Sequence, residues 1–131
     1  MTRMQVESGS PYEKLYGFSR GLRRGRRVEI AGTAPIPDPG QEVAATAYEQ
    51  MLRCGEIVVK ALQQLGSSAD EVVRTRMFIT DPADADAVGR AHGELFGDAR
   101  PVATMVVVAA LLDPAWKVEL EVEALTSDDH G

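Results

Sequence analysis

The sequence predicts a two-layer α+β sandwich in which two helices pack on one face of a mixed sheet. Three patterns support this class: a helical apolar stripe over residues 42–65, strict alternation over 117–125, and β-branched runs over 72–80 and 102–109. An apolar period near 3.6 is typical of a helix, and a period of two is typical of a half-buried strand. The elements follow one another as β-β-α-β-α-β-β, and that order suits two packed layers.

A β-hairpin is expected within residues 12–33. Its second strand ends at Ala31-Gly32-Thr33, and its first strand is expected to contain Tyr16, Phe18 and Arg20. Three prolines within residues 35–40 exclude a regular element there, so an ordered loop should follow the hairpin. The chain ends, about 1–10 and 126–131, are polar and are expected to be loose parts of a single domain over 1–131.

The first helix is expected over residues 42–65. Its apolar stripe recurs at steps of three or four residues and comprises Val43, Ala47, Met51, Cys54, Val58, Ala61 and Leu65. Gly66 follows the stripe, where a glycine commonly ends a helix. Asp81-Pro82 supplies an N-cap and a first-turn proline for a second helix that runs to about Phe96. Gly89 and Gly93 on that helix predict close backbone packing.

Two strands complete the expected sheet. Residues 102–109 form an apolar run that is typical of a buried strand, with Thr104 and Val106 on one face. In residues 117–125 the apolar side chains face one way, and Glu119, Glu121 and Glu123 face the other. Neighbouring carboxylates on one face repel each other unless cations intervene. Candidate cationic partners are Arg20, Arg27, Arg74 and Arg76.

Composition excludes several classes of function. With 14 basic and 20 acidic residues among 131, the net charge is −6, which disfavours a general nucleic-acid binder. No apolar run reaches the roughly 18 residues that cross a bilayer, and the first residues lack the apolar core of a signal peptide, so a cytoplasmic protein without a membrane partner is expected. One cysteine and two histidines predict no metal site.

Four stretches, taken in order, carry a family resemblance. They are EIAGT at 29–33, ALQQLGSSADEVV at 61–73, RMFITDP at 76–82 and VELEVEA at 118–124. On these stretches the chain resembles the Rid family, also called the YjgF or L-PSP endoribonuclease family, over residues 12–125. The resemblance implies a chorismate-mutase-like homotrimer with clefts between subunits. It also implies hydrolysis of reactive enamines or imines to 2-keto acids and ammonia, without a metal or an organic cofactor.

The resemblance also assigns site residues. Glu121 matches the family's glutamate that positions the hydrolytic water, so it is the catalytic candidate. The binding candidates Phe18, Ala31, Gly32 and Gly89 stand at or beside positions where active members carry a tyrosine, a serine, a glycine and an asparagine. Ala103 stands where active members carry the arginine that binds the substrate carboxylate. Standard 2-imino acid deaminase activity is therefore not expected.

Two further binding candidates lie near that missing arginine. Arg100 precedes it by three residues, and a guanidinium is a natural partner for a carboxylate. Thr104 offers a hydroxyl. Arg100 is alternatively a surface or subunit-bridging arginine, Thr104 a core residue, and Glu121 one member of an ion-paired row. His92 and Cys54 fall on apolar helix faces and are interpreted as packed residues.

The expected function is binding of a small, anionic metabolite, with hydrolysis of an enamine, an imine or a related conjugated species by Glu121 and water. The alternative is a non-catalytic trimer that binds a metabolite or a partner. A ribonuclease or translation inhibitor is the third hypothesis, and its one signal is the arginine-rich stretch over residues 20–27. That stretch lacks the interleaved aromatic residues that stack on single-stranded nucleic acid.

Overall fold

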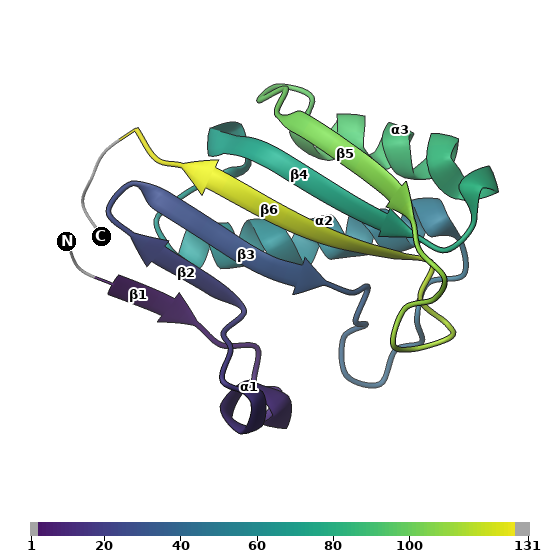
Figure 1. Cartoon of the computed structure of the whole chain (residues 1–131), viewed down its shortest axis with the longest axis horizontal. Helices are drawn as coiled ribbons and strands as arrows, with labels where there is room; N and C mark the ends of the chain where they lie inside the picture. The colour runs from purple at the N-terminus through teal and green to yellow at the C-terminus, as the bar shows by residue number, and fades with distance from the viewer. Residues whose placement is uncertain (1–2, 128–131) are drawn as a thin grey trace.

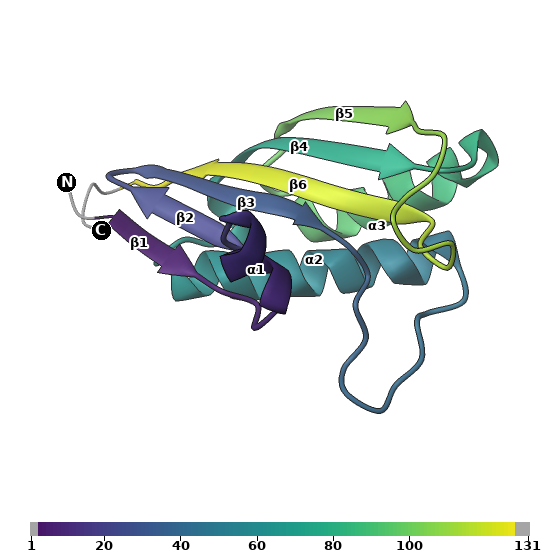
Figure 2. The same cartoon turned by 60° about the horizontal axis from the view of Figure 1, so that its bottom comes forward.

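The fold is one sheet with the helices α2 and α3 on a single face of it (Figures 1 and 2). The computed structural model describes residues 3–127. The strands are β1 (Arg3–Val6), β2 (Gly21–Arg24), β3 (Arg27–Thr33), β4 (Val72–Ile79), β5 (Val102–Val107) and β6 (Val118–Leu125). The helices are α1 (Pro11–Tyr16), α2 (Ala47–Gln64) and α3 (Ala85–Phe96), with short 3-10 turns at Ala69–Glu71 and Pro82–Asp84.

The sheet has the order β1-β2-β3-β6-β4-β5, so the last strand along the chain lies between β3 and β4. The β4–β5 pair is parallel and the other pairs are antiparallel, which confirms the predicted mixed sheet. Figure 2 shows α2 and α3 together beneath this sheet. The predicted two-layer α+β class is therefore confirmed, with β1 and α1 as additions.

Helix α2 supplies one side of the core because its apolar stripe meets the inner face of β6. Met51, Cys54, Val58 and Leu62 are fully buried, as are Val118 and Leu120 on β6. The helix begins at Ala47 rather than at residue 42, because the side chain of Thr46 caps it by accepting a hydrogen bond of 3.1 Å from the Glu49 amide. Gly66 follows it with a φ of 78°, as predicted for a terminating glycine.

The N-terminal region differs from the prediction. Residues 3–6 form β1 on the sheet edge instead of a loose end, and their partner is β2. Tyr16 lies in α1, and Phe18 lies between α1 and β2, so neither is in the first hairpin strand. The Ser10 hydroxyl accepts a hydrogen bond from the Tyr12 amide, and Pro11 occupies the first turn. This cap and proline start a helix where the apolar pattern alone indicated a strand.

Buried Arg23 joins three parts of the chain that are distant in sequence. Its guanidinium donates hydrogen bonds to the Gly25 carbonyl at 2.8 Å, to the Leu65 carbonyl at 3.0 Å and to the Thr126 hydroxyl at 3.3 Å. Thr126 is fully buried, and its amide donates to the Arg26 carbonyl. The predicted loose tail is therefore wrong for Thr126, and residues 128–131 lie outside the described residues.

Strand β5 is an edge strand and is not buried within this chain. Val102, Val106 and Val107 are 57%, 42% and 53% exposed, so the predicted burial is wrong for a single chain. The expectation of close packing at Gly89 and Gly93 is also wrong here, since a Cβ at either position would meet nothing within 4 Å. Both predictions were wrong for the same reason. They were made from the apolar or small residues of one element alone, and that composition does not show whether another element packs against it.

We predict that Leu62→Ala lowers the free energy of unfolding by about 2–5 kcal/mol, because it leaves a cavity between α2 and the sheet. Denaturant unfolding monitored by circular dichroism measures the change. Leu112→Ala is the matched control, because Leu112 is 97% exposed, and it should change stability by less than about 0.5 kcal/mol. Equal losses from the two variants would contradict the assigned core.

Candidate functional site

An open cleft of about 840 Å³ lies beside the end of β3 and the start of β6. Its size falls in the range that accommodates small metabolites. One wall comes from β3, β6 and the segment before β2. The other wall comes from α2, the loop that follows β3 and the loop that precedes β6. Its residues include Phe18, Arg20, Ala31, Gly32, Ile36, Arg53, Ile57, Lys60, Trp116 and Glu119.

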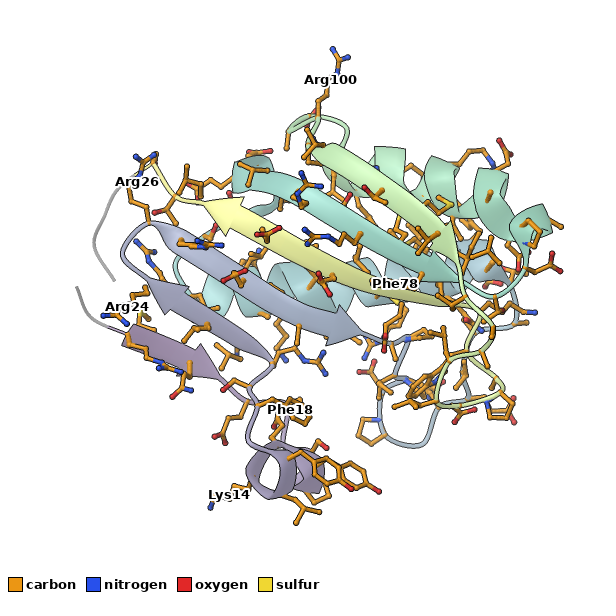
Figure 3. The ribbon with its side chains drawn as sticks, viewed as in Figure 1. Lys14, Phe18, Arg24, Arg26, Phe78 and Arg100 are labelled. Carbon is orange, nitrogen blue, oxygen red and sulfur yellow. The ribbon has the colours of Figure 1, made fainter. Side chains whose placement is uncertain are left out.

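Three of the binding candidates from the sequence meet in this cleft. Phe18, Ala31 and Gly32 all line it, and the labelled Phe18 lies before the start of β2, near α1, in Figure 3. Gly32 allows a close approach, because a Cβ there would lie 3.3 Å from Oε2 of Glu119. The glycine therefore lets a carboxyl group from β6 stand against β3.

The guanidinium of Arg20 belongs to the same cleft. Its Nη1 donates a hydrogen bond of 3.0 Å to the hydroxyl of Thr33, which is fully buried and donates in turn to the Ala31 carbonyl at 2.8 Å. Burial lowers the pKa of Arg20, and the nearby Glu13 raises it. An arginine remains cationic under such conditions, so the cleft holds a positioned positive charge.

Glu119 is an acidic residue of the cleft that interacts electrostatically with Arg20. Burial raises the pKa of Glu119 above its ordinary value, Arg20 lowers it, and Glu121 raises it again. A partly buried carboxyl of raised pKa can exchange protons closer to neutral pH. The sequence named Arg20 as a candidate partner of the glutamate row that includes Glu119, but within residues 3–127 the two side chains form no ion pair within 4.0 Å and influence each other only electrostatically.

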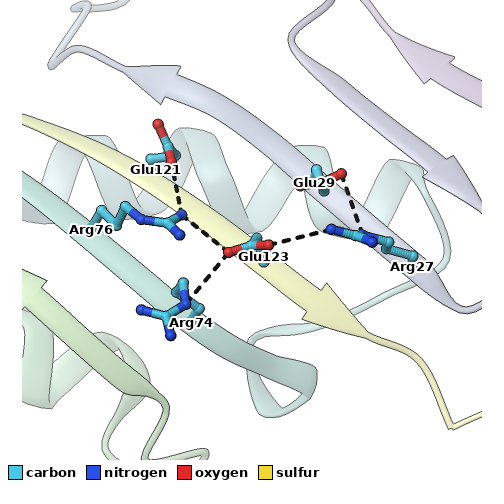
Figure 4. A network of polar contacts seen from close by, with 6 residues as sticks. All are labelled: Arg27, Glu29, Arg74, Arg76, Glu121 and Glu123. Atoms are coloured by element: carbon cyan, nitrogen blue, oxygen red, sulfur yellow. Dashed lines mark hydrogen bonds and ion pairs between the residues drawn. The ribbon is translucent and has the colours of Figure 1, made fainter.

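Glu121 is in a different environment, on the open face of the sheet (Figure 4). Its Oε1 lies 2.9 Å from Nη1 of Arg76, and the same nitrogen lies 3.1 Å from Oε2 of Glu123. Arg74 and Arg27 approach Glu123 at 3.7 and 3.8 Å. The predicted pairing of the glutamate row is therefore confirmed for Arg27, Arg74 and Arg76. Arg20 makes no ion pair within 4.0 Å to any residue between 3 and 127.

The remaining candidates do not line the cleft of this chain. The sheet register places Thr104 in one row with Arg76 and Glu121, on the exposed edge strand. Arg100 is exposed in the turn before β5 with a φ of 49°, and Figure 3 shows its side chain directed away from the sheet. Gly89 is exposed on α3. These residues meet the cleft only if another subunit supplies them.

The arginine-rich stretch does not form one basic surface. Arg20 lies in the cleft and Arg23 is buried, while Nε of Arg26 donates to the Thr126 carbonyl at 2.7 Å. Arg27 lies near Glu29 at 3.5 Å as well as near Glu123. Figure 3 shows Arg24 and Arg26 at the turn end of the hairpin, away from Phe18. Most of these guanidinium groups thus have partners within the chain.

His92 and Cys54 occupy packed positions. Nε2 of His92 lies 2.8 Å from the Thr75 hydroxyl, its ring contacts Phe96, and burial lowers its pKa. Cys54 is fully buried, and burial raises the pKa of its thiol to about 12, so it is not a nucleophile. Over residues 3–127 no group of three or more His, Cys, Asp or Glu side chains is arranged to hold a metal ion, and no helix there is long and apolar enough to span a membrane.

A sequence model of the family described as endoribonuclease L-PSP matches residues 10–126. The chain belongs to this family. An uncharacterized protein of Streptomyces coelicolor is 40% identical over 120 residues, covering 92% of this chain and 90% of the relative. A RutC family protein of Pyrococcus abyssi is 28% identical, covering 72% of this chain and 75% of that one.

Solved structures of the same family share the fold. A Mycobacterium tuberculosis member of the YjgF/YER057c/UK114 family superposes with a TM-score of 0.87 at 36% identity, covering 95% of this chain and 100% of that one. A Yersinia pestis protein of the Rid family, described as of unknown function, gives a TM-score of 0.82 at 25% identity, covering 95% and 100%. The resemblance predicted from the sequence is therefore confirmed at the level of family and fold.

We predict that Glu119 titrates above its ordinary pKa of 4.5, because burial disfavours its ionised form. Arg20→Met should raise this pKa further, since it removes a nearby positive charge, and Glu121→Gln should lower it, since it removes a negative one. Carbon-detected NMR titration of the side-chain carboxyl groups measures both shifts.

The same pKa fixes the sign of the pH dependence of stability. Between the unfolded and folded pKa values the folded state binds more protons at Glu119, so this residue's contribution to stability falls as pH rises through that window. Arg24→Met is the control, because Arg24 is exposed at the far end of β2, and it should leave the titration of Glu119 unchanged. A shift in this control as large as that of Arg20→Met would contradict the proximity of Arg20 and Glu119.

Proposed function

We propose that this chain forms a cytoplasmic homotrimer that binds a small, anionic metabolite and hydrolyses an enamine, an imine or a related conjugated species without a cofactor. The observation that carries the proposal is the convergence of Phe18, Ala31 and Gly32 on one cleft that also contains a guanidinium and a carboxyl of raised pKa. A cation in such a cleft can orient an anionic substrate, and a carboxyl group can move the protons that hydrolysis requires.

The proposed reaction needs one water and one proton-transfer group. Water adds to the carbon of the protonated imine as the Glu121 carboxylate accepts a water proton, which gives a neutral carbinolamine with an amino group. The Glu121 carboxylic acid then donates this proton to the amino nitrogen. The carbon–nitrogen bond breaks as the hydroxyl oxygen forms the carbonyl double bond, ammonia leaves, and the hydroxyl proton returns to the Glu121 carboxylate. Glu121 and Glu119 lie two residues apart on β6, roughly 6.8 Å along the strand, so water can link them.

The proposed trimer gives a role to residues that are remote from the cleft in one chain. Arg100, Thr104 and Gly89 are exposed, and we propose that a neighbouring subunit brings them to the ligand. The apolar side chains of β5 support an interface, since Val102, Val106 and Val107 lack cover within this chain. Arg100 would then be a carboxylate-binding residue at the subunit boundary.

The substrate is expected to differ from a short 2-imino acid. Ala103 occupies the position of the carboxylate-binding arginine of active family members, so that charge-assisted contact is absent there. A guanidinium–carboxylate hydrogen bond contributes about 1.5–3 kcal/mol, which corresponds to about one to two powers of ten in rate. We therefore propose little acceleration with the imines of alanine or 2-aminobutyrate.

A specific contact favours a second candidate function, a non-catalytic metabolite- or partner-binding trimer. The Arg76–Glu121 ion pair of 2.9 Å occupies one oxygen of the proposed base. If that pair persists when ligand is bound, the cleft can bind an anion without activating water. Binding without hydrolysis of any imine would favour this second function.

We predict that the protein sediments as a species of three chains at micromolar concentration, because β5 leaves an apolar edge exposed. Val106→Glu should shift the distribution toward the single chain of 14.1 kDa, since it places an unpaired charge in the proposed interface. Analytical ultracentrifugation measures both. A wild-type protein that sediments as one chain would remove the proposed inter-subunit cleft.

We predict that Glu121→Gln lowers imine hydrolysis on the order of 10²–10⁴-fold and leaves ligand binding within about twofold, because the amide keeps the shape but cannot accept a proton. The assay generates a panel of imines with an amino-acid oxidase and follows keto-acid release above the uncatalysed rate. Glu29→Gln, on the exposed rim of the same ion-paired row, is the matched control. Unchanged turnover in Glu121→Gln would show that another group acts as the base.

A further inference from the structure

We infer that Arg20 is the principal carboxylate-binding residue of the cleft, and that its ligand is a monocarboxylate with an apolar body larger than a four-carbon imino acid. This inference rests on the proposed function, because it names the ligand class and the anchoring residue for the same cleft. The principal anion-binding residue is therefore Arg20, in the segment before β2 that also lines the cleft. It is not Arg100, in the turn before β5.

The anchoring of Arg20 suits this role. Thr33 holds Nη1 at 3.0 Å, and Thr33 is itself buried and fixed to the Ala31 carbonyl. An arginine side chain carries five N–H donors. Among residues 3–127, Arg20 has no other side-chain hydrogen bond and no ion pair within 4.0 Å. Most of its donors are therefore available to a bound anion, and the guanidinium need not be reoriented.

The other cations of the cleft are less suited to the same task. Arg53 donates to the Ile36 carbonyl at 2.6 Å and to Asp38 at 3.1 Å, and it lies 3.4 Å from Glu56, so its charge is already compensated. Lys60 is exposed on α2, where its ammonium is a hydrated point charge without a bidentate geometry. Arg20 is thus the positioned cation of the cleft that retains donors for a ligand.

Glu119 does not cancel Arg20 in the way that a surface ion pair would. The two residues influence each other electrostatically, yet no contact within 4.0 Å joins them. Burial raises the pKa of Glu119, and any negative charge on this carboxyl would repel an anionic ligand held by Arg20. Replacing this carboxyl by an amide should therefore preserve or strengthen carboxylate binding.

The cleft lining indicates the rest of the ligand. Acidic residues at its rim, Glu7, Asp38 and Glu56, disfavour a ligand with several negative charges, such as a polyphosphate. The lining also includes large apolar and aromatic side chains, namely Phe18, Ile36, Ile57, Leu112 and Trp116. A volume of about 840 Å³ exceeds what a three- or four-carbon acid fills. Together these features select one carboxylate on an apolar body.

The test is equilibrium binding measured by isothermal titration calorimetry at neutral pH, with phenylpyruvate as the probe and pyruvate as the small comparison. Wild-type protein should bind phenylpyruvate more tightly than pyruvate. Arg20→Met should weaken phenylpyruvate binding roughly 10- to 100-fold, and Arg20→Lys should recover part of the loss. Glu119→Gln should bind at least as tightly as the wild type. Arg24→Met, an exposed arginine on the same hairpin, should stay within about twofold.

Three results would overturn the inference. In the first, Arg20→Met binds phenylpyruvate with the affinity of the wild type. In the second, Glu119→Gln loses phenylpyruvate binding while Arg20→Lys keeps it, and in the third the wild-type protein binds pyruvate more tightly than phenylpyruvate. Circular dichroism melting checks that each variant folds, and if Arg20→Met does not, Arg20→Lys and Glu119→Gln decide the outcome. Arg20-dependent binding without imine hydrolysis would support this inference and refute the proposed reaction. Imine hydrolysis lost in Arg100→Ala but retained in Arg20→Met would support the proposed function and refute this inference.

Discussion

The alternation of side chains along β6 determines how the rest of the molecule is arranged. Val118, Leu120 and Val122 must be buried, so both long helices cover the same face of the sheet. The intervening glutamates then lie on the other face, at the centre of the sheet, where neighbouring strands must supply cations. Arg27 on one side and Arg74 and Arg76 on the other do so. The alternation of apolar and acidic residues along β6 therefore places the core on one face of the sheet and the ion-paired glutamates on the other.

The cleft lies beside an irregular part of the pairing of β3 with β6. Their register shifts between Ile30 and Thr33, so Glu119 faces a strand that no longer pairs with it regularly. Gly32 leaves room for the carboxyl, and Thr33 turns its hydroxyl toward Arg20. The irregular part of these two strands therefore borders the cleft, whereas their regular part carries the ion-paired residues Arg27, Glu121 and Glu123.

Much of the fold could be predicted from periodicity, because α2 and β6 bury continuous apolar faces that few other arrangements satisfy. The α1 helix could not, since Ser10 and Pro11 act through local capping while Tyr16 and Phe18 favour a strand. The ion pairs between the β6 glutamates and arginines were predictable, because three glutamates on one face of a strand need cations on the neighbouring strands. The hydrogen bond of Arg20 to Thr33 was not, because it depends on how the segment before β2 packs against the end of β3, which no periodic pattern records.

The position of β6 also has a consequence for folding during synthesis. Of the six strands it is made last, yet it pairs with both β3 and β4 at the middle of the sheet. Until it emerges from the ribosome, β1-β2-β3 and the β4-α3-β5 segment have no shared hydrogen bonds and expose two unpaired inner edges. Pairing across such long sequence separations is slow and leaves edges open to other nascent chains. The inner edges of β3 and β4 therefore stay unpaired until β6 is available to join them.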